Sequence, residues 1–153
     1  MKTTLVRAGA VAFIGLALGT VASAAAAPTT FEPKCGISAS VTLEGQQLSY
    51  EVRKGDSTSA GALTLETEKT VRVTVADYNF DGYQDFSASH TDDGMGTYTL
   101  FHIFVYEPKT NNFVALRPKC GDEFINVVVN PKKRTLTNSY FADNRMKSCS
   151  AKY

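Results

Sequence analysis

The residues best suited to chemistry form a nine-residue segment, Asp77 to Asp85, with the pattern D-x-N-x-D-G-x-x-D. Oxygen-bearing side chains stand at its first, third, fifth and ninth positions, and the glycine at the sixth allows a sharp turn. Calcium is a hard cation that takes about 6–8 oxygen ligands, and a curled loop with this spacing directs its oxygens inward. The sequence therefore predicts a calcium site formed by the side chains of Asp77, Asn79, Asp81 and Asp85 and the backbone carbonyl of Tyr83.

This segment differs from an EF-hand loop, which carries a glutamate at its twelfth position, where this chain has Ala88. Magnesium is a poorer match because it prefers a small octahedral shell that keeps several waters. The alternative is an Asx-rich turn at Asp81-Gly82 that needs no ion. We favour an ion, since three neighbouring carboxylates without a basic residue repel one another. We expect a structural rather than a catalytic role, because the protein oxygens leave little open coordination.

The first two dozen residues have the layout of a secretory signal peptide. Lys2 and Arg7 precede an apolar run from Ala8 to Ala22, and an Ala-x-Ala cleavage site ends at Ala24. The run is shorter than the ~20 residues of a spanning helix, and no cysteine follows it as a lipid anchor. We therefore expect residues 1–24 to be removed, residues 25–153 to form one domain, and the protein to be periplasmic or secreted without stable membrane insertion.

The charge balance argues against a nucleic-acid-binding protein. The chain has 16 basic and 15 acidic residues, a formal net charge of +1, whereas nucleic-acid-binding domains are clearly basic. The charges are also segregated along the chain, because residues 73–108 contain no Lys or Arg and residues 109–153 are rich in both. An acidic centre followed by a basic end influences which ions and partners approach each region.

In an oxidising compartment the three cysteines are better suited to disulfide pairing than to metal binding. An odd number leaves at least one thiol over. Cys120 with Cys149 closes the shortest loop and is the preferred pair, while a bridge from Cys35 to Cys149 stays open as the alternative. One bridge would stabilise the fold by about 2–4 kcal/mol. The oligomeric state is not determined by these features.

Period-two hydrophobicity predicts short β-strands and no helix in residues 25–153. Residues 97–106 are apolar on both alternating faces, so we expect a central strand covered on both sides. Two hairpins are expected, one from segments 37–43 and 46–53 and one from segments 124–129 and 135–141, with further strands at 62–66, 70–76, 112–116 and 148–153 and polar loops at 55–61 and 87–98. The predicted fold class is all-β, with antiparallel sheets in an incomplete propeller-like or sandwich-like stack.

The segment VADYNFDGYQDF resembles the calcium loop of FG-GAP and VCBS propeller repeats. Together with the turn YEPKTNNF and the segment NPKKRTLTNSYF, it makes residues 71–141 similar to a group of small bacterial periplasmic proteins with a propeller-like β fold. That group includes a type IV secretion immunity protein that binds calcium and inhibits a lysozyme-like toxin. A closed propeller needs at least four blades of about 40 residues each, so residues 25–153 could form only an incomplete one.

This resemblance implies a non-enzymatic binding protein, an immunity protein or inhibitor of a peptidoglycan hydrolase. The expected contact surface is the loop after the calcium segment, with candidate partner-binding residues His90, Asp92, Asp93 and Tyr98. An aromatic or polar side chain such as Tyr98 could enter the glycan-binding cleft of a lysozyme-like enzyme. A core-facing position in a strand is the competing and favoured interpretation of Tyr98.

The sequence gives little support for an enzyme, since it contains no G-x-S-x-G, H-E-x-x-H or Cys-His signature. Asp92 and Asp93 are adjacent, so on an extended backbone their carboxylates point in opposite directions. His102 lies inside a predicted strand, where a packed or hydrogen-bonded histidine is the commoner case. The alternative function is a calcium-stabilised cell-surface adhesion or interaction module, in which the basic residues near the C-terminus contact an anionic surface.

Overall fold

The computed structural model describes residues 27–153, and the regular elements of this part are all β-strands. The all-β prediction is therefore confirmed for these residues. The predicted signal peptide, residues 1–24, lies outside the described residues. Within residues 27–153 there is no helix with the length and hydrophobicity needed to cross a membrane.

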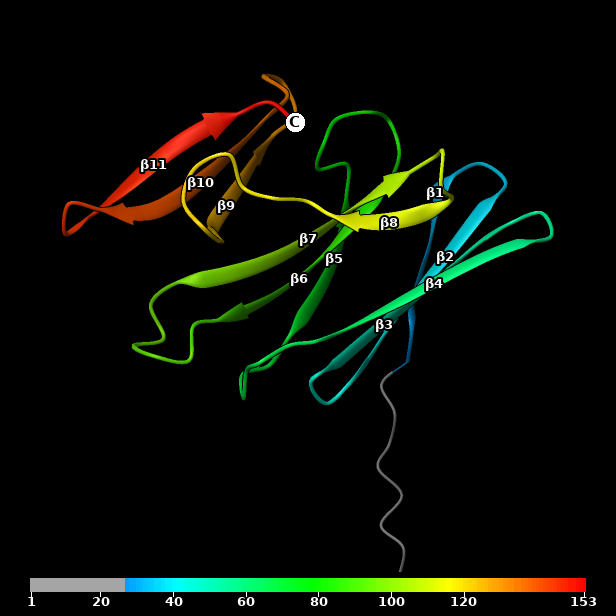
Figure 1. Ribbon diagram of the computed structural model, residues 1–153, viewed down its shortest axis with the longest axis horizontal. Helices are drawn as coiled ribbons and strands as arrows, with labels where there is room; N and C mark the ends of the chain where they lie inside the picture. The colour runs from blue at the N-terminus through cyan, green and yellow to red at the C-terminus, as the bar shows by residue number, and fades with distance from the viewer. Residues whose placement is uncertain (1–26) are drawn as a thin grey trace, which may run out of the picture.

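Four antiparallel strands form the first sheet, in the order of the chain (Figure 1). They are β1 (Thr29–Lys34), β2 (Ile37–Glu44), β3 (Gln47–Lys54) and β4 (Ser57–Thr64). Each connecting turn has two residues and contains a glycine with positive φ, a conformation that glycine adopts without steric cost. The hairpin predicted from segments 37–43 and 46–53 is confirmed as β2 and β3.

Two strands of the first sheet differ from the sequence prediction. β1 has no counterpart in it, and β4 occupies most of segment 55–61, which was expected to be a polar loop. β4 is rich in Ser, Ala and Gly, residues with weak β propensity, yet it pairs with β3 from Ser57 to Thr64. The loop prediction was wrong because continuous pairing with a neighbouring strand outweighs local propensity.

The second sheet has seven strands, six of which follow the order β11-β10-β9-β7-β6-β5. Along the chain they are β5 (Arg72–Ala76), β6 (Asp85–Thr91), β7 (Thr99–Glu107), β8 (Asn112–Ala115), β9 (Phe124–Asn130), β10 (Thr135–Ala142) and β11 (Arg145–Ala151). β8 and β9 both pair with β7, along the edge opposite β6. The sheet therefore forks at β7, which has the central position predicted for residues 97–106, and the predicted hairpin of segments 124–129 and 135–141 is confirmed as β9 and β10.

β6 is the main error of the sequence prediction in the second sheet. Segment 87–98 was expected to be a polar loop, but residues 87–91 belong to β6, and every residue from Asp85 to His90 is buried. Short polar side chains such as Ser87 and Ser89 favour loops when the sequence is considered alone. Between β5 and β7 their small size instead lets the strand pack on both faces.

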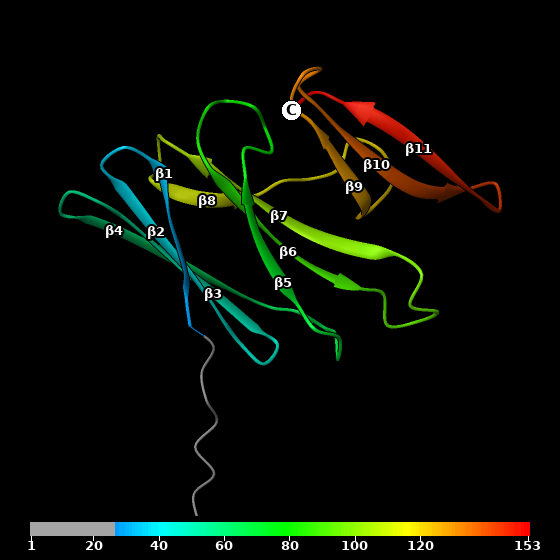
Figure 2. The ribbon, with the colours of Figure 1, turned by 180° about the vertical axis from the view of Figure 1, so that it is seen from behind.

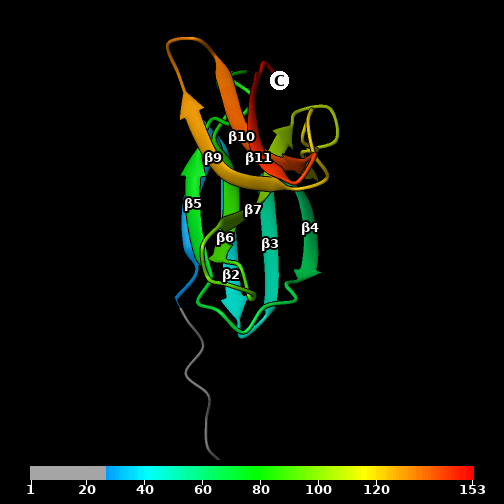
Figure 3. The ribbon, with the colours of Figure 1, turned by 90° about the vertical axis from the view of Figure 1, so that its left-hand side faces the viewer.

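The main core lies between the first sheet and the part of the second sheet formed by β5 to β8. Figure 3 views the molecule from the end formed by β9–β11, with the first sheet behind them. Aromatic rings dominate this core: Phe86 stacks on Phe104 with ring centroids 4.8 Å apart, and Phe113 meets Phe86 edge-on at 4.8 Å. The two sheets pack face to face, which supports the sandwich-like alternative of the predicted fold.

A second, smaller core lies on the other face of β7. Its buried residues are Tyr78, Ile103, Phe124 and Leu136. The strands β9, β10 and β11 extend the second sheet away from β1–β4, as Figures 1 and 2 show from opposite sides. Tyr78 belongs to the loop between β5 and β6, so this loop packs against β7 through Ile103 and against β9 and β10 through Phe124 and Leu136.

Tyr50 of β3 links the two sheets, because its hydroxyl donates a 3.1 Å hydrogen bond to the carbonyl of Phe113 in β8. Gly61 lies directly opposite Tyr50 on β4. A Cβ atom on Gly61 would fall 2.3 Å from the Tyr50 hydroxyl oxygen, so the ring needs a glycine at this position.

We expect Gly61→Ala to lower the free energy of unfolding by about 1–3 kcal/mol, because the added methyl displaces the Tyr50 ring from its contacts. Urea denaturation followed by circular dichroism measures the change. Ala62→Ser, an exposed substitution on the same strand, is the control and should change stability by less than about 0.5 kcal/mol. A Gly61→Ala protein as stable as the wild type would contradict the assigned role of this glycine.

The disulfide prediction is confirmed, since Cys120 and Cys149 are bonded and their Cα atoms are 6.6 Å apart. The bridge joins the segment before β9 to β11, the outermost strand of the second sheet. Cys35, in the turn between β1 and β2, is the exposed free cysteine of the described residues.

We expect the double substitution Cys120→Ser and Cys149→Ser to lower the free energy of unfolding by about 2–4 kcal/mol, because the unfolded chain regains the entropy of an open loop. Urea denaturation of the oxidised protein and of the variant measures the difference. Cys35→Ser is the matched control and should leave stability unchanged. Equal stability of the double variant and the wild type would show that the bridge does not constrain the unfolded chain.

Candidate metal centre

The predicted calcium segment forms the connection between β5 and β6. Ala76, the last residue of β5, pairs directly with Asp85, the first residue of β6. This pairing closes the loop at its base and brings its first and ninth positions, Asp77 and Asp85, to neighbouring places. The hairpin geometry thus gathers the ligand-bearing positions into one curled segment, as the spacing predicted.

Hydrogen bonds from the backbone to acidic side chains produce the curl. The carboxylate of Asp77 accepts the N–H groups of Asp81 (3.1 Å) and Gly82 (2.9 Å). The carboxylate of Asp81 in turn accepts the N–H of Tyr83 at 2.9 Å. Asn79 completes the network, because its amide oxygen accepts the Asp81 N–H at 3.1 Å and its NH₂ donates to the Asp81 carboxylate at 2.9 Å.

Two residues of the loop have positive φ. Gly82, with φ of 88°, occupies the sixth position, where the sequence pattern requires a glycine. Phe80, with φ of 63°, adopts the left-handed region although it has a side chain, which costs roughly 1 kcal/mol or more. The ring of Phe80 packs against the second core, so tertiary contacts offset this local cost.

Asp85 differs from the other acidic residues of the loop because it is completely buried. One carboxylate oxygen accepts the N–H of Tyr78 at 2.8 Å, and the other accepts the N–H of Tyr106 on β7 at 2.9 Å. Burial raises the pKa of Asp85 to about 7; the two N–H donors act in the opposite direction, and the charge of Asp81 adds to the rise. Asp85 therefore combines two structural hydrogen bonds with an environment that disfavours its negative charge.

Contacts outside the loop tie it to three other parts of the molecule. The N–H of Gln84 donates to the carbonyl of Pro33 in β1 at 2.8 Å, which connects the loop to the first sheet. The bond from Tyr106 to Asp85 connects it to β7. The guanidinium group of Arg134, in the turn between β9 and β10, donates to the carbonyl of Phe80. Any ligand that stabilises the loop would therefore stabilise contacts among β1, β7 and β9–β10.

The donor set fits calcium in its chemistry, since all of the predicted ligands offer oxygen. Within residues 27–153, however, no three or more His, Cys, Asp and Glu side chains converge in an arrangement able to hold a metal ion. Asn79 and the carbonyl of Tyr83 fall outside those residue types, and the carboxylates of Asp77 and Asp81 are turned toward loop N–H groups. Calcium binding by Asp77, Asn79, Asp81, Tyr83 and Asp85 therefore stays a prediction.

The structure separates the residues that the sequence suggested for partner binding. His90 is buried in β6, where a ring nitrogen lies 2.9 Å from the carbonyl of Thr91 and the ring stacks on His102 with centroids 6.0 Å apart. A buried histidine has no access to the cleft of another protein. His90 is therefore a poor candidate for a partner contact, because residues 87–91 of the segment assigned to a loop belong to β6.

Asp92 and Asp93 organise the loop between β6 and β7. Asp92 accepts the N–H of Tyr98 at 2.7 Å, and this bond lowers the pKa of its carboxyl group. Asp93 accepts the hydroxyl of Thr67 and the N–H of Glu68, both at 3.1 Å, and the Thr67 bond is the main reason that its pKa is lowered. Asp92 thus shapes the loop from within, and Asp93 connects the loop to the β4–β5 segment.

Tyr98 is half-buried, and its ring meets the ring of Phe141 edge-on with centroids 5.8 Å apart. Phe141 is 58% exposed and pairs across β10 and β11 with Met146, which is 36% exposed. We call these three residues the Tyr98 patch. No local pattern in the sequence indicates that Phe141 lies beside Tyr98, because only the fold brings β10 to the start of β7.

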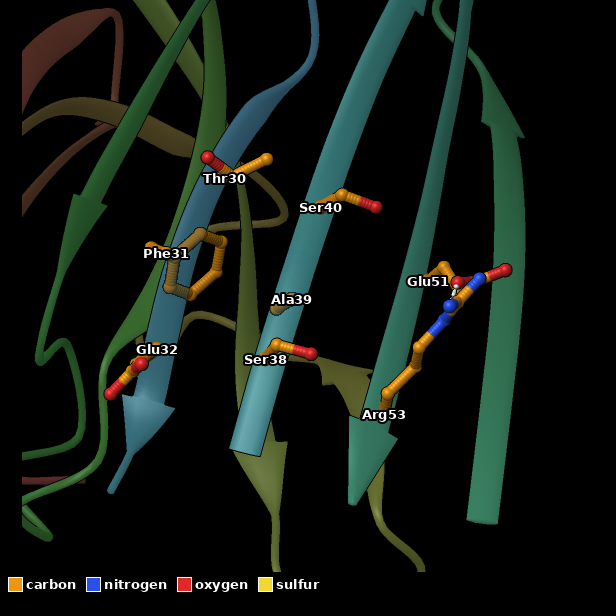
Figure 4. Close-up of a pocket in the computed structure, with 8 residues that line it drawn as sticks. All are labelled: Thr30, Phe31, Glu32, Ser38, Ala39, Ser40, Glu51 and Arg53. Carbon is orange, nitrogen blue, oxygen red and sulfur yellow. Dashed lines mark hydrogen bonds and ion pairs between the residues drawn. The ribbon is translucent and has the colours of Figure 1, made fainter. Parts of the chain in front are cut away.

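A shallow groove also crosses the outer face of the first sheet (Figure 4). Thr30, Phe31 and Glu32 of β1 and the short side chains of β2 line one part of it, and Arg53 and Glu51 of β3 line the other. The Arg53 Nε atom lies 2.5 Å from a Glu51 carboxylate oxygen, so these two charges neutralise each other. The groove therefore presents no free charged pair for catalysis or ion binding on β3.

Comparison of the chain with protein-family models, with curated proteins and with solved structures finds no match. The function is therefore argued from the residues of this chain.

Proposed function

We propose that this protein is a calcium-stabilised, non-enzymatic binding domain that works in the periplasm or outside the cell. The observation that carries the calcium part is the buried carboxylate of Asp85, at the end of a loop whose oxygen ligands follow calcium spacing. An ionised carboxylate in a protein interior costs several kcal/mol unless an opposite charge offsets it. Calcium in the loop would supply that charge.

Calcium can act on Asp85 without replacing the existing hydrogen bonds. A carboxylate has about four acceptor sites on its two oxygens, and the N–H groups of Tyr78 and Tyr106 use two of them. The remaining acceptor sites of Asp85 would bind a cation together with the oxygens of Asp77 and Asp81, whose carboxylates would turn from the loop N–H groups toward the ion. Calcium would therefore strengthen an arrangement that the backbone already holds.

Two features support a location outside the cytoplasm. The Cys120–Cys149 disulfide is the kind of bond that forms and persists in an oxidising compartment. The sequence of residues 1–24 has the three-part layout of a signal peptide. Calcium at the millimolar concentrations found outside cells would also fill a loop of modest affinity.

The partner that we propose is a peptidoglycan hydrolase of the lysozyme-like kind, which makes the protein an immunity protein or inhibitor. The support is the resemblance of residues 71–141 to a group of small bacterial periplasmic proteins that includes an immunity protein, together with the Tyr98 patch. Exposed aromatic residues on a protein surface are frequent anchors of protein–protein contacts. Phe141 is the most exposed aromatic side chain among the large hydrophobic residues of the described surface.

An inhibition assay tests this function. Purified residues 25–153, with calcium, should slow the digestion of peptidoglycan by at least one hydrolase of a lysozyme-type panel. Phe141→Ala should weaken the inhibition at least tenfold, which corresponds to about 1.4 kcal/mol or more of binding free energy. Val128→Ala, which shortens a side chain that is 60% exposed on β9, is the matched control and should have no effect.

Absence of inhibition across the panel would contradict the proposed partner. Salt-sensitive binding of the same protein to whole cells would then favour the adhesion module, because basic side chains attract anionic surfaces most strongly at low salt.

A further inference from the structure

The fork of the second sheet contains a cavity that the proposed function does not use. β8 pairs with β7 from Phe104 onward and β9 pairs with Leu100 and Phe101, so the two strands leave the same edge of β7 in different directions (Figure 1). A cavity of about 330 Å³ lies there, which we call the fork pocket. Its lining comes from β4, β7, the end of β8 and the segment that leads to β9.

Apolar side chains form much of the lining of the fork pocket. Leu100 and Phe104 are four residues apart on β7, so their side chains share one face of that strand. Their partners on β6 are His90 and Phe86. Leu63 of the first sheet and Leu116, just after β8, add to this surface. The pocket thus offers an apolar surface from two sheets, to which Ile103 and Phe124 of the second core also contribute.

Charges of both signs lie around this apolar surface. Arg117 follows β8, and Asp122 and Glu123 precede β9; all three side chains are exposed and line the pocket. In the part of the chain that the structure describes, the ion pairs are Arg53–Glu51 and Lys147–Asp143. The charges of Arg117, Asp122 and Glu123 are therefore free to interact with a ligand.

We propose that the fork pocket binds a small zwitterionic ligand with an apolar body, namely a short peptide with apolar side chains and free termini. The Arg117 guanidinium pairs with the ligand carboxylate, since its fork of N–H donors matches two carboxylate oxygens. Asp122 and Glu123 bind the ligand ammonium, and the leucine and phenylalanine side chains contact the apolar body. A ligand of this class uses both signs of charge and the apolar surface at once.

The size of the pocket favours a dipeptide over a larger ligand. Pockets for small molecules span about 300–1,000 Å³, and the fork pocket is at the lower end of that range. His102 also lines the pocket, and burial, with a contribution from the neighbouring His90, lowers its pKa. A neutral imidazole adds a hydrogen-bonding group without adding to the charge, so the two acidic residues remain the partners of the ammonium.

Titration of the ¹⁵N-labelled domain with the dipeptide Leu-Leu tests the proposal by nuclear magnetic resonance. We expect saturable shifts at the amides of Leu100, His102 and Leu116 at millimolar concentrations. N-acetyl-Leu-Leu, which lacks the ammonium, and Leu-Leu amide, which lacks the carboxylate, should each bind about tenfold more weakly, as expected for loss of one charged contact. Equal binding of all three peptides, or no saturable shift at the pocket, would overturn the proposal.

Two variants assign the charges to their ligand groups. Arg117→Gln should weaken Leu-Leu about tenfold but leave the affinity for Leu-Leu amide unchanged, because that peptide has no carboxylate for Arg117 to bind. Glu123→Gln should show the opposite pattern, losing affinity for Leu-Leu and not for N-acetyl-Leu-Leu. Arg145→Gln and Glu68→Gln, at exposed sites outside the pocket, are the controls and should bind as the wild type does. If both pocket variants weaken all three peptides equally, the charge assignment is wrong.

This test is independent of the proposed function. The fork pocket and the calcium loop use different residues, and the assay measures neither calcium binding nor inhibition of a hydrolase. Failure of the peptide titration would remove the ligand site and leave the calcium and hydrolase proposals unaffected.

Discussion

Asp85→Ala is expected to lower the free energy of unfolding by about 3–5 kcal/mol, the largest effect of any single substitution proposed here. The variant leaves the N–H groups of Tyr78 and Tyr106 buried without an acceptor, and each orphaned donor costs about 1–3 kcal/mol. It also removes a predicted calcium ligand and opens space in the interior. Urea denaturation in calcium-containing buffer measures the loss.

Asp85→Asn separates the hydrogen bonds from the charge. Asparagine has the same shape, but its NH₂ group faces one of the two N–H donors, so one bond is replaced by a repulsive contact. We expect a loss of about 1–3 kcal/mol, smaller than that of Asp85→Ala. Asp122→Ala, at an exposed acidic residue, is the control and should change stability by less than about 0.5 kcal/mol. If Asp85→Ala behaves like this control, Asp85 does not connect the loop to β7 energetically.

Calcium is expected to raise the melting temperature of the wild-type domain, because a ligand that binds only the native state stabilises that state. At a free calcium concentration 1,000 times the dissociation constant, the gain is about 4 kcal/mol. Adding a chelator should remove the gain, and magnesium at the same concentration should produce less of it, since this ion dehydrates reluctantly. Differential scanning calorimetry with calcium, with magnesium and with chelator measures the three states.

Asp81→Ala is the variant that ties the calcium response to the loop. Asp81 is the fifth position of the pattern and is exposed, so its loss should abolish the calcium-dependent shift with a small effect on the chelated protein. Asp122→Asn should keep the full shift. Identical melting curves for the wild type with calcium and with chelator would mean that the loop is an ion-free Asx turn. The proposal of a calcium-stabilised domain would then fail, whatever the outcome for hydrolase inhibition.

The calcium loop and the disulfide show how far local patterns reach. The spacing from Asp77 to Asp85 predicted a curled loop between two strands, and the curl is held by bonds within the loop itself. The Cys120–Cys149 bridge was preferred because it closes the shortest loop, and it is the bridge observed. The first prediction depends on residues within one turn of the chain, and the second depends on the lower entropy cost of closing a loop of 29 residues than a longer one.

β4 and β6 show where local patterns fail. Their small and polar residues suggested loops at 55–61 and 87–98, but pairing with neighbouring strands makes residues 57–61 and 87–91 part of the sheets, while residues 92–98 do form a loop. The same error placed His90 on a binding surface, whereas the packing of β6 places it inside the protein. Pairing energy comes from the neighbouring strand, so the segment alone does not reveal it.

The sequence by itself determined the all-β class, the β2–β3 and β9–β10 hairpins, the spacing of the oxygen-bearing residues in the loop and the central place of β7. These features follow from side-chain periodicity and backbone sterics within a few residues. Only the tertiary structure decided that β8 and β9 share an edge of β7, that Phe141 lies against Tyr98, and that Tyr106 donates to Asp85. Those contacts join residues far apart in the chain, and they form because packing two sheets leaves few arrangements that bury the apolar faces and satisfy the buried polar groups.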